Sequence, residues 1–506
     1  MNFQLLLLFL YFLIDFSSYK NQFIGTRFKG NLDNIQMSKE ILRLERPLAG
    51  FQKEMYLPKT EGEEIGTRFS LDFSKKAQGN HIKIILDQVP IKDGEVKYTA
   101  SKKFDNLLKL EAHITLLPIK VKEEYKKTVT ICYHHNLGHN ILYEGECKID
   151  NEHFGGLDSQ FMDIYAQYFV KKRELYNRMI GNIPCLEEWS TELPGLPLIV
   201  PQPYSFSRNT RVSIPLLKST NNTVTFEYKV RTKLTDLLKM RVLLKDGTYK
   251  VLPVCNLKYL DTKNATNIPI PEMWGRYSEM TDEERNWRKS IDMKTGEPTK
   301  QIIYIEDIDK MSSKNPIPIG TKETLSLSGS APCKHIFWMA SLTDSGFSNY
   351  TTNRNDLYRG YNPCAKASIK YGSSDRVEEM GHENFDLSEC YDFEWYNTPC
   401  EAGYNVHTYT FNPNDIQNAD TAVNLKECGA TLTVLLGDTN PFINKDEEKE
   451  YYNDDGEVIP IEALEDHQDE NKKDKYIVHV RTVVTRKLEV FWSDKTSSLK
   501  YIFTST

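Results

Sequence analysis

Short runs of alternating polar and apolar residues, separated by Gly, Pro, Asn and Asp, constrain the fold of this chain more than any other feature. In Thr223–Val230 the alternation has no break, so the apolar side chains of this run lie on one face of a strand. Similar strand-like runs occur at 68–73, 81–89, 110–119, 129–134, 141–149, 335–340, 365–371, 406–411, 430–436, 476–485 and 487–492. Many short strands joined by polar turns predict an all-β fold of sandwiches or barrels.

The chain is long enough for two such units. It has 506 residues, and all-β domains often run to roughly 200–250 residues. Between Val254 and Pro271 the strand pattern lapses into Asn, Asp, Thr, Lys and Pro, and strands resume near Ile302. We therefore expect an N-terminal arm at 1–55, one β domain at 56–258 and a second β domain at 270–506.

Two helices and one acidic segment are expected between the strands. The range Leu157–Met179 predicts a helix, because its apolar residues recur at helical spacing. These residues are Phe161, Ile164, Tyr165, Tyr168 and Phe169. Thr281-Asp-Glu-Glu284 has the pattern of a capping box at the start of a second, short helix. Residues 446–475 are acidic with interspersed Lys and carry too little apolar surface to order themselves, so we expect a long exposed loop.

Charge and cysteine content exclude several classes of protein. The net charge is −7, and the densest basic cluster is Lys171–Arg173, which we interpret as a solvated helix face. Direct nucleic-acid binding is not expected, because it needs a concentrated basic patch. The nine cysteines are odd in number and widely spaced, without a C-x-x-C pair. This pattern predicts neither a zinc site nor a dense disulfide framework, and it favours reduced thiols.

The N-terminus leaves several interpretations open. Leu5–Ile14 is a continuous apolar run that is short for a membrane span. No Lys or Arg precedes it, which argues against a signal peptide. A cleaved signal, a membrane-facing arm, a buried arm and a start codon assigned too early all remain open. We expect no other segment of the sequence to cross a membrane.

A search for catalytic and metal-binding patterns finds one weak candidate. His134, His135 and His139, with Glu144 and His153 downstream, form the best metal-like cluster. It lacks the general-base Glu of an H-E-x-x-H motif, and Gly138 with the flanking strand patterns favours a turn. No G-x-S-x-G, Walker or G-x-G-x-x-G motif occurs. The sequence thus predicts no catalytic residues, no metal and no cofactor.

Three sequence sites match the acceptor pattern for N-glycosylation. They are Asn221, Asn264 and Asn349, each followed two residues later by Thr. Since the pattern is common by chance, we treat these asparagines as candidate modification sites.

Several strings resemble, in order, those of the major capsid proteins of nucleocytoplasmic large DNA viruses. The most specific is Pro197–Asn209, PLIVPQPYSFSRN, followed closely by Val212–Leu217, VSIPLL. The family's His-Asn turn, Met-Ile-Gly string, acidic helix and Asn-Pro strand are also matched. Their counterparts here are His135–Ile141, Tyr176–Asn182, Thr281–Arg285 and Gly403–Pro413. Together the matches cover roughly residues 60–490, and their shared order identifies the chain as a divergent member.

The resemblance implies a double jelly roll, which is two eight-stranded sandwiches in one chain. It implies homotrimers that form pseudo-hexagonal capsomers of an icosahedral capsid, assembled in the host cytoplasm. Neighbouring capsomers, minor capsid and penton proteins would be its partners, with an inner viral membrane nearby. No catalytic residues carry over from the family. Three alternatives stay open: a jelly-roll scaffold or minor capsid protein, a secreted glycan-binding β-sandwich, and a metal-dependent enzyme that uses the histidine cluster.

Overall fold

A computed structural model describes the chain from residue 79 to residue 504, with internal gaps. The gaps are residues 93, 210–211, 245–246, 248, 253–254, 262–266, 292–295, 330, 344–345, 354–356, 394, 417–421, 438–450, 453–457 and 460–473. The arm predicted at 1–55, its apolar run, the strand at 68–73 and most of the acidic segment 446–475 lie outside the described residues. Within that segment, the short strands β24 (Tyr451–Tyr452) and β25 (Val458–Ile459) pair with each other.

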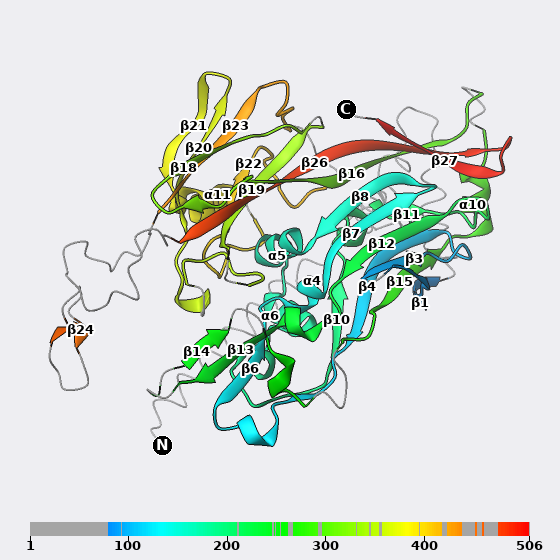
Figure 1. Cartoon of the computed structure of the whole chain (residues 1–506). Helices are drawn as coiled ribbons and strands as arrows, with labels where there is room; N and C mark the ends of the chain where they lie inside the picture. Colours follow the sequence, from blue (N-terminus) through cyan, green and yellow to red (C-terminus); the bar gives the residue numbers. More distant parts are fainter. Residues whose placement is uncertain are drawn as a thin grey trace, which may run out of the picture.

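Two sheets form the first sandwich (Figure 1). One has the order β1-β15-β4-β10, with β11 also paired to β4, and the other has the order β2-β3-β12-β7-β8. The strands of the first sheet are β1 (Gly79–Ile85), β4 (Asn106–Thr115), β10 (Pro197–Pro201), β11 (Ile214–Pro215) and β15 (Glu272–Glu279). Those of the second are β2 (Asp87–Lys92), β3 (Glu95–Thr99), β7 (Leu142–Ile149), β8 (Glu152–Asp158) and β12 (Val224–Val230).

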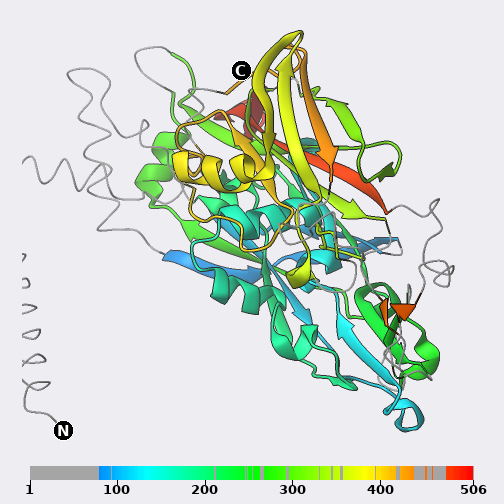
Figure 2. The ribbon, with the colours of Figure 1, turned by 90° about the vertical axis from the view of Figure 1, so that its left-hand side faces the viewer.

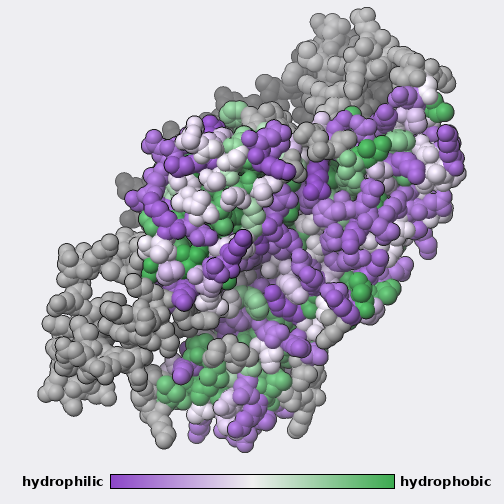
Figure 3. All heavy atoms as spheres, turned by 45° about the horizontal axis from the view of Figure 1, so that its top comes forward, coloured by the Kyte–Doolittle hydropathy of each residue, from purple (hydrophilic) through white to green (hydrophobic). Residues whose placement is uncertain are grey.

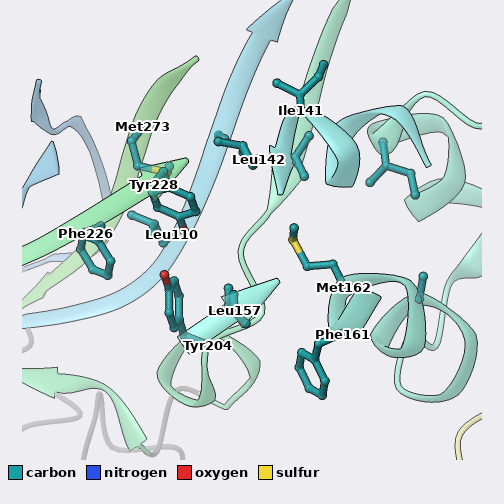
Figure 4. Close-up of a cluster of buried hydrophobic side chains, with 14 of the residues drawn as sticks. Leu110, Ile141, Leu142, Leu157, Phe161, Met162, Tyr204, Phe226, Tyr228 and Met273 are labelled. Atoms are coloured by element: carbon teal, nitrogen blue, oxygen red, sulfur yellow. The ribbon is translucent and has the colours of Figure 1, made fainter. Parts of the chain in front are cut away.

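Apolar and aromatic side chains fill the space between these two sheets. Figure 4 shows Leu110 of β4 and Met273 of β15 close to Phe226 and Tyr228 of β12, and all four are buried. The Tyr228 hydroxyl donates a hydrogen bond of 2.9 Å to the side chain of Gln202, so its polar end is satisfied inside the core. The alternation read from Thr223–Val230 therefore places its apolar face in this core, as predicted.

Smaller sheets extend the first sandwich at one end. One has the order β14-β13-β6, and another pairs β5 with β9. Their strands are β5 (Ile119–Lys120), β6 (Val129–Tyr133), β9 (Glu192–Leu193), β13 (Leu238–Leu243) and β14 (Tyr249–Leu252). Short helical turns lie near them: η2 (Glu123–Tyr125), α7 (Pro184–Glu187), α9 (Leu234–Leu237) and η4 (Leu257–Tyr259), whereas the short helix α8 (Ser205–Arg208) packs against β4.

The second sandwich also has two sheets. One has the order β16-β26-β19-β22, with β17 and β27 also paired to β26, and the other has the order β18-β23-β20-β21. The strands of the first are β16 (Lys300–Ser312), β17 (Ile317–Pro318), β19 (Cys333–Leu342), β22 (Asn405–Thr408), β26 (Lys475–Ser493) and β27 (Ser498–Thr504). Those of the second are β18 (Lys322–Ser326), β20 (Cys364–Tyr371), β21 (Ser374–Gly381) and β23 (Ala430–Leu436). The double jelly-roll architecture expected from the resemblance is confirmed.

The long strand β26 contributes to both hydrophobic cores. The sequence predicts two strands at 476–485 and 487–492, but β26 runs without a break from Lys475 to Ser493. Its partner β16 stays in register with it from Lys300 to Ser312. Val478 and Val480 pack in the second core, whereas Leu488 and Val490 pack in the first. Figure 1 shows β16 and β26 extending from the second sandwich across the first, so the two sandwiches share a backbone element.

The predicted start of the second domain at residue 270 is too early by one strand. β15 pairs with β1 and β4 and therefore belongs to the first sandwich. Its buried side chains Met273 and Tyr277 pack in the first core. The lapse of the strand pattern before Pro271 thus marks a loop inside the first sandwich, and the sheets of the second sandwich begin with β16.

The helix predicted at 157–179 is two helices. α5 (Ser159–Tyr168) and α6 (Arg173–Ile180) are separated by Phe169–Lys172. Asp158 caps α5 by accepting a hydrogen bond of 2.8 Å from the Phe161 amide. At α10 (Asp282–Arg288), the Thr281 hydroxyl accepts a hydrogen bond from the Glu284 amide, as the capping box predicts.

The second sandwich also carries short helical segments in the described part of the chain. They include η5 (Leu357–Arg359), the π-helical turn η6 (Asn384–Ser388) and α11 (Glu389–Asp392). Figure 2 shows this last, yellow helical segment next to the teal helices of the first sandwich. No helix in the described part of the chain is long and apolar enough to span a membrane.

Candidate functional site: the junction of the two sandwiches

Charged side chains from both sandwiches are buried where the two sandwiches meet. Charged groups rarely enter a protein interior unless they are paired, because removing them from water is costly. The face of the molecule drawn in Figure 3 is largely hydrophilic, with separate apolar patches. Three groups of paired charges, two of them buried and one partly exposed, tie elements of the first sandwich to elements of the second.

The first group is an ion triad of Arg208, Glu306 and Lys334. Arg208 ends α8 of the first sandwich, while Glu306 and Lys334 lie on β16 and β19 of the second. Glu306 is 2.7 Å from Arg208 and 2.7 Å from Lys334, and its side chain is 1% exposed. Burial by itself would raise the pKa of Glu306, but the two cations outweigh this effect and lower the pKa to about 2. Glu306 is thus a buried anion held by one cation from each sandwich.

The second group joins Arg481 of β26 to the start of α5. The Arg481 guanidinium lies 2.8 Å from the Asp158 carboxylate, and it also contacts Gln160. Asp158 therefore has two functions, since it caps α5 and accepts an ion pair from the second sandwich. Both side chains are at most one-tenth exposed, so water screens this pair little.

The third group is a chain of alternating charges that crosses from β3 to β26. Its links are Lys97–Glu227 (3.4 Å), Glu227–Lys148 (2.6 Å), Lys148–Glu146 (3.0 Å), Glu146–His153 (2.8 Å), His153–Asp307 (2.8 Å) and Asp307–Arg486 (3.0 Å). The first sandwich supplies the chain up to His153, and the second supplies Asp307 and Arg486. The crossing between sandwiches is the His153–Asp307 contact.

A pocket of about 250 Å³ opens beside this crossing. Its lining includes Glu144, Glu146 and His153 from β7 and β8, and Ile308 and Lys310 from β16. Glu144 is paired with Lys229 at 2.5 Å and with Lys310 at 3.1 Å. The carboxylates of the pocket wall are thus neutralised by neighbouring cations.

The histidines of the metal-like cluster do not converge on one point. His135 lies between Glu187 and Glu401, with ring-to-carboxylate distances of 2.5 and 3.0 Å. His139 bonds to Asp163 at 2.7 Å and to the Tyr176 hydroxyl at 3.0 Å. Within the described residues, no group of three or more His, Cys, Asp or Glu is arranged to hold a metal ion.

Two further details concern that cluster. Residues 137–141 form the one-turn helix α4 (Leu137–Ile141) rather than the turn expected from Gly138. Asn136 precedes it in the left-handed conformation with φ of 51°, which Asn tolerates better than most residues. His134 is half-buried against Phe347, and the loss of hydration lowers its pKa to about 3. These side chains are therefore part of the packing and ion pairing at the junction.

The candidate glycosylation sites lie in different environments. Asn221 is exposed, and its amide donates to the Thr496 carbonyl at 3.0 Å. Asn349 is only 1% exposed and donates to the Asn353 carbonyl at 2.7 Å, so the folded chain has no room for a glycan there. Asn264 lies outside the described residues. Modification of Asn221 stays a prediction.

Sequence reasoning missed the ion triad and the role of Asp158. A signal was present, because Glu306 and Lys334 interrupt the apolar strands that became β16 and β19. A charge inside an apolar strand predicts a buried partner. Arg208 belongs to the string Pro197–Asn209 that carries the family resemblance. The sequence could not reveal that these three residues meet, because they lie in different elements far apart in the chain.

No family model matches the chain, but individual relatives do. The chain is 25% identical over 345 residues to the major capsid protein of Lymphocystis disease virus 1 (isolate Darai). That alignment covers 64% of this chain and 72% of the relative. The major capsid protein of Tipula iridescent virus is 21% identical over 342 residues, with 64% of this chain and 71% of the relative covered.

A solved structure shares the fold. The chain resembles a chain of the quasi-atomic model of the PBCV-1 virus capsid with a TM-score of 0.58 at 13% sequence identity. The match covers 84% of this chain and 98% of that chain. Nearly the whole of that capsid chain therefore has a counterpart in the two sandwiches described above.

Proposed function

This chain is a divergent member of the double jelly-roll major capsid proteins of nucleocytoplasmic large DNA viruses, and we propose that three copies of it form a pseudo-hexagonal capsomer. It is a structural protein of the virion capsid. The main support for the trimer proposal is that strand β26 packs in both hydrophobic cores and so fixes the two sandwiches of one chain to each other. Three such chains around a threefold axis place six similar sandwiches in a ring.

The work of this protein is assembly rather than catalysis. The charged groups at the junction support this proposal, since each is bound to a partner of opposite charge. Glu306 is held by Arg208 and Lys334, and Asp158 is held by Arg481. Paired groups of this kind hold the two sandwiches in a fixed arrangement, whereas a catalytic acid or base must be free to exchange a proton with a substrate.

The partners of the proposed capsomer are neighbouring capsomers, minor capsid proteins and penton proteins, with an inner viral membrane nearby. Assembly takes place in the host cytoplasm. This part of the proposal is supported by the family resemblance alone. The edge strand β2 is exposed along its whole length and carries the exposed apolar residues Val89 and Ile91. An exposed edge of this kind is a natural place for contact between chains.

The native mass of the purified chain tests the proposal. Sedimentation equilibrium should give about three times the chain mass of 58.7 kDa, with no dissociation on dilution to low micromolar concentration. Electron microscopy should show pseudo-hexagonal discs. A monomer that binds oligosaccharides would contradict the capsomer and favour the glycan-binding alternative.

A further inference from the structure

Two histidines at the junction share an unusual arrangement. His153 lies between Glu146 of the first sandwich and Asp307 of the second, with 2.8 Å to each carboxylate. His135 lies between Glu187, in α7 of the first sandwich, and Glu401, in the loop before β22 of the second. In both cases one ring nitrogen faces a carboxylate of each sandwich. This is a repeated geometry at two separate places along one junction.

We propose that His153 and His135 are protonated clamps, each holding one carboxylate of the first sandwich and one of the second, so that rising pH loosens the junction. The proposal concerns contacts within a single chain. It therefore goes beyond the capsomer proposal and does not depend on it.

The geometry requires the protonated form of each ring. A neutral imidazole has one N–H donor and one acceptor lone pair, whereas a protonated imidazole donates from both nitrogens. A carboxylate accepts hydrogen bonds and cannot donate one. A neutral His153 would therefore turn a lone pair toward either Glu146 or Asp307, and the same holds for His135 between Glu187 and Glu401. Loss of the proton therefore turns one of the two attractive contacts of each ring into a repulsive one, so the ring no longer holds both carboxylates at once.

His153 is surrounded by charged groups from four neighbouring strands. These groups are Glu144, Glu146 and Lys148 of β7, Glu227 and Lys229 of β12, Asp307, Asp309 and Lys310 of β16, and Arg486 of β26. The nearest cations hold the two clamped carboxylates, with Lys148 on Glu146 and Arg486 on Asp307. The Gly156 amide also donates to Asp307 at 2.9 Å. These contacts keep both carboxylates ionised and aimed at the ring.

His135 is more deeply buried, with 3% of its side chain exposed. The groups that face it or its two carboxylates are Asn182, Gln167, Arg173, Tyr358, Tyr404 and Cys132, and the charges of Lys239 and Arg241 also act on Cys132. Burial would raise the pKa of Glu401, but the His135 ring, with smaller contributions from Gln167 and Arg173, lowers it and keeps this carboxylate ionised. The buried ring therefore keeps an anionic partner from each sandwich.

The direction of the pH effect follows from the raised pKa of both rings. The hydrogen bond to Asp307 is the main cause for His153. Burial opposes protonation of His135, but Glu401 and Glu187 outweigh it and raise its pKa to about 10. A histidine in the unfolded chain has a pKa near 6.5. The stabilisation is therefore complete below about pH 6.5 and is lost as pH rises through the folded-state values. His153 is 39% exposed beside the pocket, so hydroxide and water reach it readily.

Hydrogen exchange of the intact chain at pH 6.5 and pH 8.5, corrected for the intrinsic rate, tests the proposal. Protection of peptides from β8 and β16 should fall at the higher pH, by at most about tenfold per pH unit for each clamp. His153→Gln should lower this protection already at pH 6.5 and remove most of its pH dependence. Glu401→Gln tests the His135 clamp without changing the buried ring itself. It should lower the protection of peptides spanning 396–409 already at pH 6.5 and remove most of the pH dependence of that protection.

His382 provides a matched control. It pairs with Asp386 at 2.9 Å, and its pKa is also raised, but both partners lie in the second sandwich. His382→Gln should leave the pH dependence at β8 and β16 unchanged. The proposal is overturned if His153→Gln keeps the parent's pH dependence at these strands, or if His382→Gln abolishes it equally.

Discussion

Replacing Glu306 by Gln should destabilise the chain by about 3 kcal/mol. The substitution keeps the shape of the side chain but leaves Arg208 and Lys334 facing each other at the junction without the anion that both contact at 2.7 Å. The pKa of Glu306 falls from 4.5 to about 2 in the fold, and each unit is worth about 1.4 kcal/mol. This figure agrees with the range of about 3–5 kcal/mol for breaking a buried ion pair.

Urea unfolding of purified variants, followed by tryptophan fluorescence, measures this loss. The unfolding midpoint should fall while the slope stays constant, because the surface exposed on unfolding is unchanged. Lys334→Met in the Glu306→Gln background should recover part of the loss, since it removes the more deeply buried of the two cations. A double-mutant cycle then isolates the coupling between Glu306 and Lys334.

The pH dependence gives an independent check. Because the folded-state pKa of Glu306 is lowered, its stabilisation is present above about pH 4.5 and is lost as pH falls toward 2. The Glu306→Gln variant should lack this component of acid sensitivity. A variant within 1 kcal/mol of the parent (about one-third of the expected loss), with the same acid profile, would refute the assignment of Glu306 as the anion that holds both cations.

Two further predictions concern single side chains. Asp158→Asn keeps a capping side chain for α5 but loses the charge that pairs with Arg481, so it should lower the free energy of unfolding by about 1–3 kcal/mol. Asp158→Ala removes the cap as well and should cost more. Equal losses of stability for the two variants in urea unfolding would contradict the double function of Asp158. Gly145→Ala should destabilise the fold by about 1–3 kcal/mol, because the added Cβ would lie 2.4 Å from the Tyr228 ring. In the control Gly156→Ala the added Cβ meets no atom closer than 3.9 Å, so its stability should be nearly unchanged. The opposite order of the two unfolding midpoints would show that the Tyr228 ring can move aside.

The strand pattern of the sequence was a good guide where one face of a strand is buried. Thr223–Val230 became β12, with Val224, Phe226, Tyr228 and Val230 all buried. The pattern failed at Arg486, which separates the two predicted strands near the C-terminus but lies inside β26. Its guanidinium is paired with Asp307 across to β16, so a charged residue in mid-strand is accommodated by a partner that the sequence does not reveal.

The family expected from the ordered strings is confirmed by the relatives and by the shared fold. The division of the chain was less predictable. Strand order depends on which strands pair, and β15 returns to the first sandwich after a long irregular segment. A lapse in alternation marks a loop, but it cannot distinguish a loop within a sandwich from a linker between two sandwiches.

Local alternation and the order of short strings by themselves determined that this chain is all-β, divided into two units and related to viral capsid proteins. These properties depend on residues close together in the sequence, because the period of a strand and the chemistry of a turn are local. Only the tertiary structure decided that Arg208, Glu306 and Lys334 meet, that His153 and His135 bridge the sandwiches, and that β26 serves both cores. Charge pairing across sequence separations of 28 residues (Glu306–Lys334) to 266 residues (His135–Glu401) arises from packing, which no local pattern encodes.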